Sequence, residues 1–355
     1  MMNGSASTTP GDFVHPALFY QGEAEYLAGV GGFVRAALAA DEPVFVAVPG
    51  PRMDALRESL DAGAAGVSWA DMRQLGRNPG RILAALQDFA DRQGDRPARI
   101  VGEPIWPGRT QAEVLEATRH EALINTAFAG RRATVLCPYD VLGLPSPVVS
   151  DARRTHPTVM ADGKSLPSPE YADPASVGAD CDRPLPEPDG GAPALAYGVG
   201  QLGEVRAYTE AWARGTALGA ARRGDLILAV SEAAANSLAH GGGSGSLRLW
   251  SSAGAGEGAV FRERGPRGGP QAGGTAPPPG GGAGSRGGGP RAGGGARAAP
   301  PAGGRLADPL AGRRRPSLAS VDGGRGLWMI HQLCDLVEIR SSGSGLTLRM
   351  HMACS

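Results

Sequence analysis

The sequence predicts an α/β protein of two domains, a parallel sheet covered by helices followed by an antiparallel sheet packed with helices. In the first half, short apolar segments alternate with longer amphipathic ones, which is typical of parallel sheets covered on both faces. A proline-rich stretch from about Ser165 to Pro193 then separates the halves. The second half ends in two segments that fit an antiparallel hairpin. A length of 355 residues leaves room for two domains.

The elements of the first domain follow in order. The segment VFVAV (44–48) is a β-branched run stopped by Pro49-Gly50-Pro51, and the residues after it have helical spacing. Further strands are expected at 66–70, 98–103 and 133–137, and further helices at 80–94 and 110–130. We therefore assign residues 13–157 to one α/β domain and residues 158–199 to a proline-rich linker.

The second domain is expected over residues 200–352. Residues 200–219 place apolar side chains along one helical stripe, and Asp225 is expected to cap a second helix that runs to about Ala239. The segment SLRLW (246–250) alternates like a strand, and a glycine-rich turn opens a helix over 323–335. The segments LVEIR and LTLRMHM flank a short glycine loop, as antiparallel strands would. This pattern predicts an α+β domain with helices on a sheet.

Residues 253–304 interrupt the second domain. They are mostly Gly, Ala, Pro and Arg, a composition that buries too little apolar surface to offset the entropy of ordering the chain. We expect a disordered insertion here. The same composition also arises when a GC-rich gene is read out of frame, and both explanations stay open.

Composition excludes several classes of function. The 35 Lys and Arg residues balance 35 Asp and Glu residues, so no net charge directs the protein to nucleic acid or to a membrane surface. Four cysteines lie far apart without a C-x-x-C pair, so we predict neither a disulfide framework nor a zinc site. No basic leader and no stretch of ~18 apolar residues is present, which favours a cytoplasmic protein.

The segment SEAAANSLAHGGG (231–243) carries the clearest candidate site. Glu232, Asn236 and His240 follow one another at intervals of four residues and would share a helix face. Oxygen atoms of an amide and a carboxylate suit Mg²⁺, and the carboxylate can instead activate a hydroxyl. The simpler interpretation is a polar helix face that ends in a glycine cap. Downstream, Gly323-Gly324-Arg325-Gly326 precede a helix whose free N–H groups can bind phosphate.

Together these motifs resemble the ATP-binding domain shared by gyrase, sensor histidine kinases and RsbW-type anti-sigma-factor serine kinases. EAAAN resembles the N box, GGRGL the glycine box, and GSGLTLRM the final box. The resemblance implies a Bergerat ATP-binding fold, a two-layer α+β sandwich. It implies ATP and Mg²⁺ as cofactors, Glu232 as the catalytic carboxylate and Asn236 as the Mg²⁺ ligand. Other implied ATP-binding residues are His240, Glu263, Gly265, Gly324, Arg325, Gly326, Leu327 and Thr347.

The chain departs from this family at the adenine site. The family has a strand that ends in D-x-G, whose aspartate binds the adenine amino group. Here the nearest candidate is FRERG, with Glu263 in place of the aspartate and Gly265 after it. The longer side chain would shift or weaken the binding of adenine, so a domain that no longer binds ATP is an alternative.

Residues 13–157 resemble the MEDS sensory domain, which is a RecA-like fold without a working P-loop. The stretches GEPIWPGRT, ATRHEALINTAF, TVLCPYD and DARRTHP carry the resemblance. It implies a small-molecule ligand, and ligands of open α/β sheets bind at the carboxyl ends of strands. The ligand-binding candidates are His15, Glu103, Tyr139 and Asp140, although burial or capping of neighbouring backbone is the more common reason for such residues at sheet ends. Other polar or aromatic residues of interest are Tyr20, Trp106, Arg109, His120, Glu121 and Asn125.

The pair His120-Glu121 superficially resembles the phosphoacceptor box of histidine kinases. That box requires a dimeric helical hairpin directly before the ATP domain, whereas His120 lies inside an α/β domain. We therefore expect a histidine on the surface of a helix.

Two functions remain. The first is a signalling regulator in which a sensory domain controls an ATP- and Mg²⁺-dependent kinase that phosphorylates Ser or Thr of an anti-sigma-factor antagonist, or holds a sigma factor inactive. The second is a non-catalytic module with a degenerate ATP site that sequesters such a partner. Neither involves nucleic acid or a membrane, and both allow a homodimer. A metabolic hydrolase is disfavoured because G-x-S-x-G and H-E-x-x-H are missing from the sequence.

Overall fold

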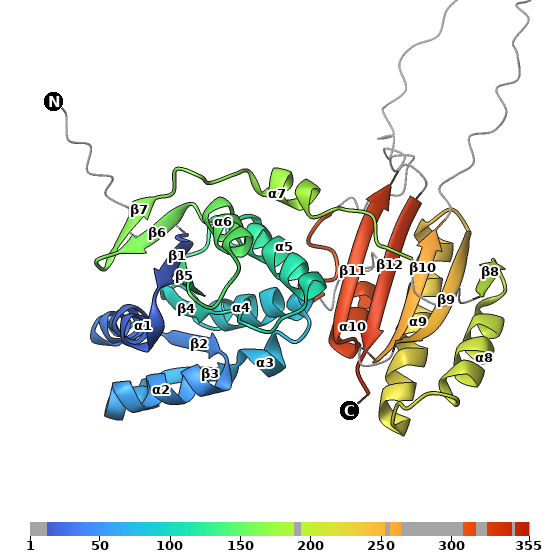
Figure 1. Ribbon diagram of the computed structural model, residues 1–355, viewed down its shortest axis with the longest axis horizontal. Helices are drawn as coiled ribbons and strands as arrows, with labels where there is room; N and C mark the ends of the chain where they lie inside the picture. Colours follow the sequence, from blue (N-terminus) through green and yellow to red (C-terminus); the bar gives the residue numbers. More distant parts are fainter. Residues whose placement is uncertain are drawn as a thin grey trace, which may run out of the picture.

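The computed structural model describes residues 13–187, 193–252, 256–263, 308–316, 325–342 and 345–354. Two domains lie side by side (Figure 1), and the N-terminal one is built on a seven-stranded sheet of order β3-β2-β4-β5-β1-β6-β7. All neighbouring pairs are parallel except β6 and β7. The strands are β1 (Pro16–Tyr20), β2 (Val44–Val48), β3 (Val67–Asp71), β4 (Ala98–Gly102), β5 (Ala133–Asp140), β6 (Thr158–Ala161) and β7 (Lys164–Pro167).

Helices cover both faces of this sheet, as the buried strands require. One face packs on α1 (Gly22–Ala39) and α2 (Gly50–Leu60), and it buries Val46, Val101 and Leu136. The other face packs on α4 (Ile82–Asp91), α5 (Gln111–Ala127) and α6 (Ser146–Thr155). Shorter turns, α3 (Met72–Leu75), η1 (Asp61–Gly66) and η2 (Pro79–Arg81), connect these elements.

The segment 158–199, expected to be a proline-rich linker, contains regular structure. Strand β6 pairs with β1 and extends the parallel sheet, and β7 pairs with β6. Helix α7 (Pro174–Asp180) buries Val177 and Cys181 against Ala122 of α5. The prolines do not prevent this structure, because Pro174 occupies the first turn of α7, where a missing N–H costs nothing.

The C-terminal domain is a two-layer α+β structure. Its antiparallel sheet has the order β11-β12-β10-β9-β8, and helices pack on one face (Figure 1). The strands are β8 (Ala194–Gly198), β9 (Ser244–Ser252), β10 (Gly256–Glu263), β11 (Leu336–Ser342) and β12 (Gly345–Met352). The helices are α8 (Leu202–Ala213), α9 (Ala220–His240) and α10 (Arg325–Leu333).

Two expectations for this domain were wrong in detail. Helix α9 begins at Ala220 with Gly219 as its N-cap, and Asp225 lies inside the helix, where its carboxylate pairs with Arg222 at 3.2 Å. The expected disordered insertion begins too early, because residues 256–263 form β10 between β9 and β12. The backbone hydrogen bonds of two neighbouring strands order a segment whose composition gives little sign of structure. The rest of the expected insertion, 264–304, lies outside the described residues.

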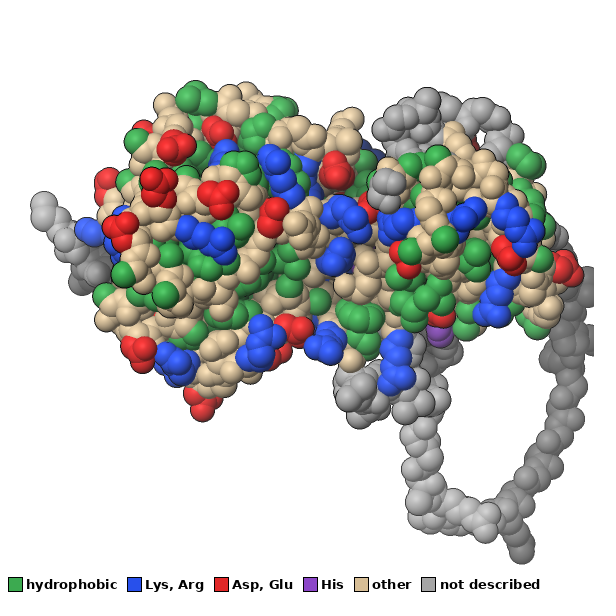
Figure 2. All heavy atoms as spheres, turned by 90° about the horizontal axis from the view of Figure 1, so that it is seen from below, with side chains coloured by type: hydrophobic (Ala, Val, Ile, Leu, Met, Phe, Trp, Pro, Cys, Tyr) green, Lys and Arg blue, Asp and Glu red, His purple; other side chains and the backbone are tan. Residues whose placement is uncertain are grey.

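The surface is mixed in charge over the N-terminal domain. Figure 2 shows Lys and Arg side chains interspersed with Asp and Glu on the face that it presents. Across the part of the chain that the structure describes, no helix has the length and apolarity that crossing a bilayer requires.

Candidate functional site

Two polar side chains of α9, Glu232 and Asn236, lie one turn apart on one face of the helix. Val230, Ala233 and Ala234 are buried in the core of the domain, whereas Glu232 and Asn236 are only partly buried. The carboxylate and the amide therefore stand at the margin of the helix layer and remain open to solvent.

The first turn of α10 lies directly against this pair. A Cβ atom added to Gly326 would come within 2.9 Å of the Asn236 amide nitrogen and 3.0 Å of a Glu232 carboxylate oxygen. Since real Cβ atoms are rarely so close to a neighbour, only glycine fits here without displacing the two side chains. The structure therefore brings Glu232, Asn236 and Gly326 together although Asn236 and Gly326 are 90 positions apart in the chain.

The remaining residues of the expected nucleotide site divide into three groups. Arg325 and Leu327 belong to the same first turn of α10, and His240 is exposed at the end of α9. Glu263 ends β10, where only the backbone is described, and Gly265 and Gly324 lie outside the described residues.

Thr347 lies apart from this group. On β12, Leu348 and Met350 are buried against the helices, so the alternation of a strand turns Thr347 to the opposite face of the sheet. The structure therefore does not bring the Thr347 side chain to Glu232 and Asn236. Thr347 is close to the final glycine loop in the chain, but this does not put its side chain in the nucleotide site.

The far end of α10 is held by the N-terminal domain. The Asn78 amide donates hydrogen bonds to the backbone carbonyls of His331 at 3.1 Å and Cys334 at 3.3 Å. These are end-of-helix carbonyls without an intrahelical partner, so Asn78 caps α10 from another domain. Its own side-chain oxygen accepts from the Gly80 N–H at 2.9 Å, and the buried ring of His331 packs directly on Gly80.

A second contact joins the domains through a buried carboxylate. Glu116 of α5 accepts from Arg313 at 2.7 Å and from Arg340 of β11 at 2.6 Å. All three side chains are at most 5% exposed, so each charge depends on the others for stabilisation.

Residues 308–316, which precede α10 in the chain, bridge the two domains. Leu310 is buried in the core of the N-terminal domain, and Arg313 pairs with Glu116. Gly312, at a φ of 75°, lies against Leu327 of α10, so closely that a Cβ atom there would come within 2.5 Å of that side chain. Both ends of α10 therefore contact structure that the N-terminal domain fixes.

In the N-terminal domain, Arg52 joins two of the expected ligand-binding residues. Its guanidinium contacts Glu103 at 2.6 Å and Asp140 at 3.1 Å, and it lies 5.0 Å from the centre of the Tyr20 ring. Glu103 follows β4 and Asp140 ends β5, which is the carboxyl edge of the parallel sheet. Burial raises the pKa of Glu103 to about 8, against the opposing influence of Arg52.

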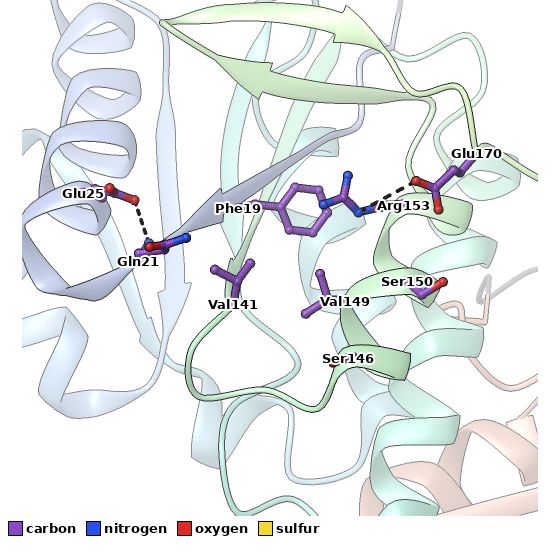
Figure 3. Close-up of a pocket in the computed structure, with 9 residues that line it drawn as sticks. All are labelled: Phe19, Gln21, Glu25, Val141, Ser146, Val149, Ser150, Arg153 and Glu170. Carbon is purple, nitrogen blue, oxygen red and sulfur yellow. Dashed lines mark hydrogen bonds and ion pairs between the residues drawn. The ribbon is translucent and has the colours of Figure 1, made fainter.

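An open pocket of about 580 Å³ lies at the same edge, beside the end of β1 (Figure 3). The ring of Phe19 forms its centre, with the Arg153 guanidinium 4.7 Å from the ring centre. Glu170 pairs with Arg153 at 3.9 Å across the rim. The other residues around the pocket are Gln21, Glu25, Val141, Ser146, Val149 and Ser150. Six of its nine lining residues are polar or charged, so the pocket presents a largely polar surface around Phe19.

His15 and Tyr139, the other two ligand candidates, are fully buried. His15 contacts Glu121 at 3.2 Å and Asn125 at 3.0 Å, and Tyr139 packs edge-on against the His156 ring, with the ring centres 5.5 Å apart. Of the remaining candidates, Arg109 stacks on Trp106, with the guanidinium carbon 3.9 Å from the centre of the indole ring.

The expectation of a surface position for His120 was wrong. His120 is 1% exposed, because α5 lies flat on the sheet and several of its polar residues face inward. Burial lowers its pKa to about 4. A sealed histidine cannot receive a phosphoryl group, which agrees with our rejection of the phosphoacceptor interpretation.

The comparisons with known families match both domains. Residues 14–157 match the MEDS model, described as the methanogen/methylotroph, DcmR sensory domain. Residues 196–352 match the histidine kinase-like ATPase domain. The chain is a MEDS domain followed by a histidine kinase-like ATPase domain. Among curated proteins, none is significantly similar to this chain.

Sequence reasoning missed the residues that join the MEDS domain to the ATPase domain. Asn78 precedes a proline and a glycine, so it is typical of a turn, and Glu116 follows the usual spacing of a polar helix position. Neither pattern distinguishes a contact between domains from a solvated surface. The position of Arg52 gave a weak indication of a binding role, since it follows Pro49-Gly50-Pro51 at the carboxyl end of a strand.

Proposed function

We propose that this protein is a signalling regulator in which ligand binding to the MEDS domain controls an ATP- and Mg²⁺-dependent kinase. Its substrate would be a Ser or Thr residue of an anti-sigma-factor antagonist. The contact of Gly326 with Glu232 and Asn236 is the observation that carries the proposal. It joins oxygen ligands, a carboxylate and the N-terminus of a helix, three features that phosphoryl transfer uses.

Each group has a role that follows from its chemistry. Asn236 offers an amide oxygen, which suits Mg²⁺ together with the oxygens of a triphosphate. Bound Mg²⁺ would neutralise charge on the phosphates. The first N–H groups of α10 lack intrahelical partners and favour an anion at this end of the helix.

Glu232 would then act as the general base. The acceptor hydroxyl oxygen attacks the terminal phosphorus, its proton passes to Glu232, and the bond to the bridging oxygen breaks to release ADP. Because Glu232 is partly exposed, a protein acceptor can reach it.

The contacts between domains support control by the MEDS domain. Asn78 and Gly80 contact the end of α10, and Arg313 ties the segment before α10 to Glu116. A ligand that moves α5 or η2 would therefore shift the helix that carries Gly326. The ligand changes ATP binding in this way only if it binds the protein more tightly with α10 in one of these two positions than in the other.

Titration of the full-length protein with ATP, with and without Mg²⁺, tests this proposal. We expect saturable binding that requires Mg²⁺, that falls at least about tenfold in Asn236→Ala, and that is largely restored in Asn236→Asp, which keeps an oxygen ligand. Thermal melting of each variant checks that the fold is intact. Equal binding by the wild type and Asn236→Ala would overturn the assignment of the site.

A second candidate is a non-catalytic module that sequesters a partner. Glu263 in place of the expected aspartate favours it. In that case the wild-type protein binds no ATP in the titration, although its fold is intact.

We further propose that the partner is a sigma factor or its antagonist, and that the protein acts in the cytoplasm, where ATP and such partners occur. The absence of net charge agrees with a protein partner rather than nucleic acid. An epitope-tagged copy of the protein, purified from the cytoplasmic fraction, would carry this partner with it and so identify it.

A further inference from the structure

Four side chains with metal-binding atoms converge in the MEDS domain, away from the ATP site. They are His15 before β1, Glu121 on α5, Cys137 on β5 and His156 after α6. All four are buried, and their ligand atoms lie within 4.8 Å of one another. Because they come from four separate segments of the chain, only the assembled fold forms this cluster.

One carboxylate oxygen is the centre of the cluster. The Oε2 atom of Glu121 lies 3.2 Å from His15 Nε2 and 3.3 Å from His156 Nε2. The Cys137 Sγ atom lies 3.4 Å from both Glu121 Oε2 and His15 Nε2. Tetrahedral zinc, with bonds of 2.0–2.3 Å, separates its ligand atoms by about 3.3–3.8 Å. These four separations are close to that range, and the remaining two are within 4.8 Å.

The surrounding hydrogen bonds orient both imidazoles. The Nδ1 atom of His156 lies 2.7 Å from the Ala152 carbonyl, which only accepts, so Nδ1 carries the proton. The Nδ1 atom of His15 lies 3.0 Å from Asn125 Oδ1, and the Asn125 amide nitrogen donates to the Thr155 carbonyl at 2.8 Å. His15 therefore also donates from Nδ1, which leaves the Nε2 lone pair of each neutral ring directed at Glu121.

A positive charge at the centre would balance this arrangement more fully than the proton of the Cys137 thiol, which the structure directs at Glu121 Oε2. Two nitrogen lone pairs and a carboxylate oxygen repel one another at 3.2–3.3 Å in a buried site. One added proton can bridge only two of these atoms.

We propose that His15, Glu121, Cys137 and His156 bind one divalent transition-metal ion, with zinc as the best fit. Imidazole and thiolate ligands suit zinc better than Mg²⁺ or Ca²⁺. With Glu121 and Cys137 ionised and both histidines neutral, the ion gives the buried site no net charge. Asn125 and the Ala152 carbonyl hold the ligands from outside, as partners of metal-bound histidines generally do. Four protein ligands complete a tetrahedral shell, so the site stabilises the domain rather than catalyses a reaction.

The test uses the untagged full-length protein and zinc or cobalt as the probe. Elemental analysis after dialysis is expected to give about one zinc per chain, and removal with a strong chelator should lower the melting temperature. Cobalt in place of zinc should give near-ultraviolet thiolate-to-cobalt absorption. A folded wild-type protein that binds neither metal would overturn the proposal, and a protonated His156 in nitrogen-15 spectra would then identify the proton as the occupant.

Variants locate the metal. Cys137→Ser and Glu121→Gln are expected to weaken zinc binding at least about tenfold, whereas Cys181→Ser, a buried cysteine on the other side of α5, should keep it. Zinc binding unchanged in both cluster variants would place the metal elsewhere and refute the assignment. If Cys137→Ser does not fold, the cobalt spectrum of Cys181→Ser still decides, because loss of the thiolate band there would contradict ligation by Cys137.

Discussion

The two groups of polar residues in this protein differ in their access to solvent. Glu232 and Asn236 stand at the margin of the ATPase helix layer and are partly exposed, and they contact a glycine. In the MEDS domain, Glu121 and its neighbours are sealed and contact only one another and the surrounding structure. An open group can receive a molecule that comes and goes, whereas a sealed group must be balanced by something that stays.

This difference separates two uses of a carboxylate. A carboxylate that performs chemistry contributes little to stability, because solvent already satisfies its charge. A sealed carboxylate contributes through its permanent partners, and its removal exposes their charges to an apolar interior. Substitutions of Glu232, Glu116 and Glu103 test this distinction.

The largest effect is expected at the open site. Glu232→Gln removes the proposed general base, so the rate of ADP formation from ATP in the presence of the proposed antagonist substrate should fall about 10²–10⁴-fold. ATP affinity and the free energy of unfolding should change little. Glu210→Gln, on the exposed surface of α8, is the matched control and should keep the full rate. A rate within about twofold of the wild type in Glu232→Gln would remove this carboxylate from the mechanism.

A sealed carboxylate at the junction should show the opposite behaviour. Glu116→Ala leaves Arg313 and Arg340 buried without their shared partner, so the free energy of unfolding should fall by about 3–5 kcal/mol. Urea denaturation measures this loss. Glu210→Ala breaks an exposed pair with Arg214 and should cost less than about 1 kcal/mol. Equal losses in the two variants would show that burial does not distinguish these carboxylates.

The smallest effect concerns pH. Burial raises the pKa of Glu103 from 4.5 to about 8, so between these values the folded protein binds a proton that the unfolded chain releases. Its contribution to the free energy of unfolding should therefore decrease as pH rises through this window. Urea denaturation between pH 5 and pH 8 should give a flatter dependence in Glu103→Gln than in the wild type. The same slope in both proteins would contradict a raised pKa.

Much of the fold could be predicted from local patterns. The strands at 44–48, 98–102 and 133–137 and the helices α4 and α5 follow their expected segments, because period and turn residues are local properties. Helix α5 begins where Thr110 and Glu113 form a capping box. Strand β1 and helix α1 gave a weaker signal, since Gly29, Gly31 and Gly32 lower the helix propensity of α1.

The errors have a common physical origin. Strands β6, β7 and β10 have little pattern of their own, and they form because neighbouring strands offer unpaired backbone groups. His120 is buried because of the way α5 lies on the sheet, not because of its sequence context. The spacing of the cysteines also gave no sign of the buried cluster in which His15 and Cys137 meet across 122 positions of the chain.

The sequence by itself determined the two domain types, the helix that presents Glu232 and Asn236 on one face, and the glycine-rich start of α10. These features depend on residues within a few positions of one another. At that range the spacing of apolar residues and the conformational freedom of glycine decide the structure. Only the tertiary structure decided that Gly326 lies against that helix face, that Asn78 caps α10 from the other domain, and that Glu121 lies between two histidines. Such contacts depend on how whole elements pack, and no local pattern encodes that packing.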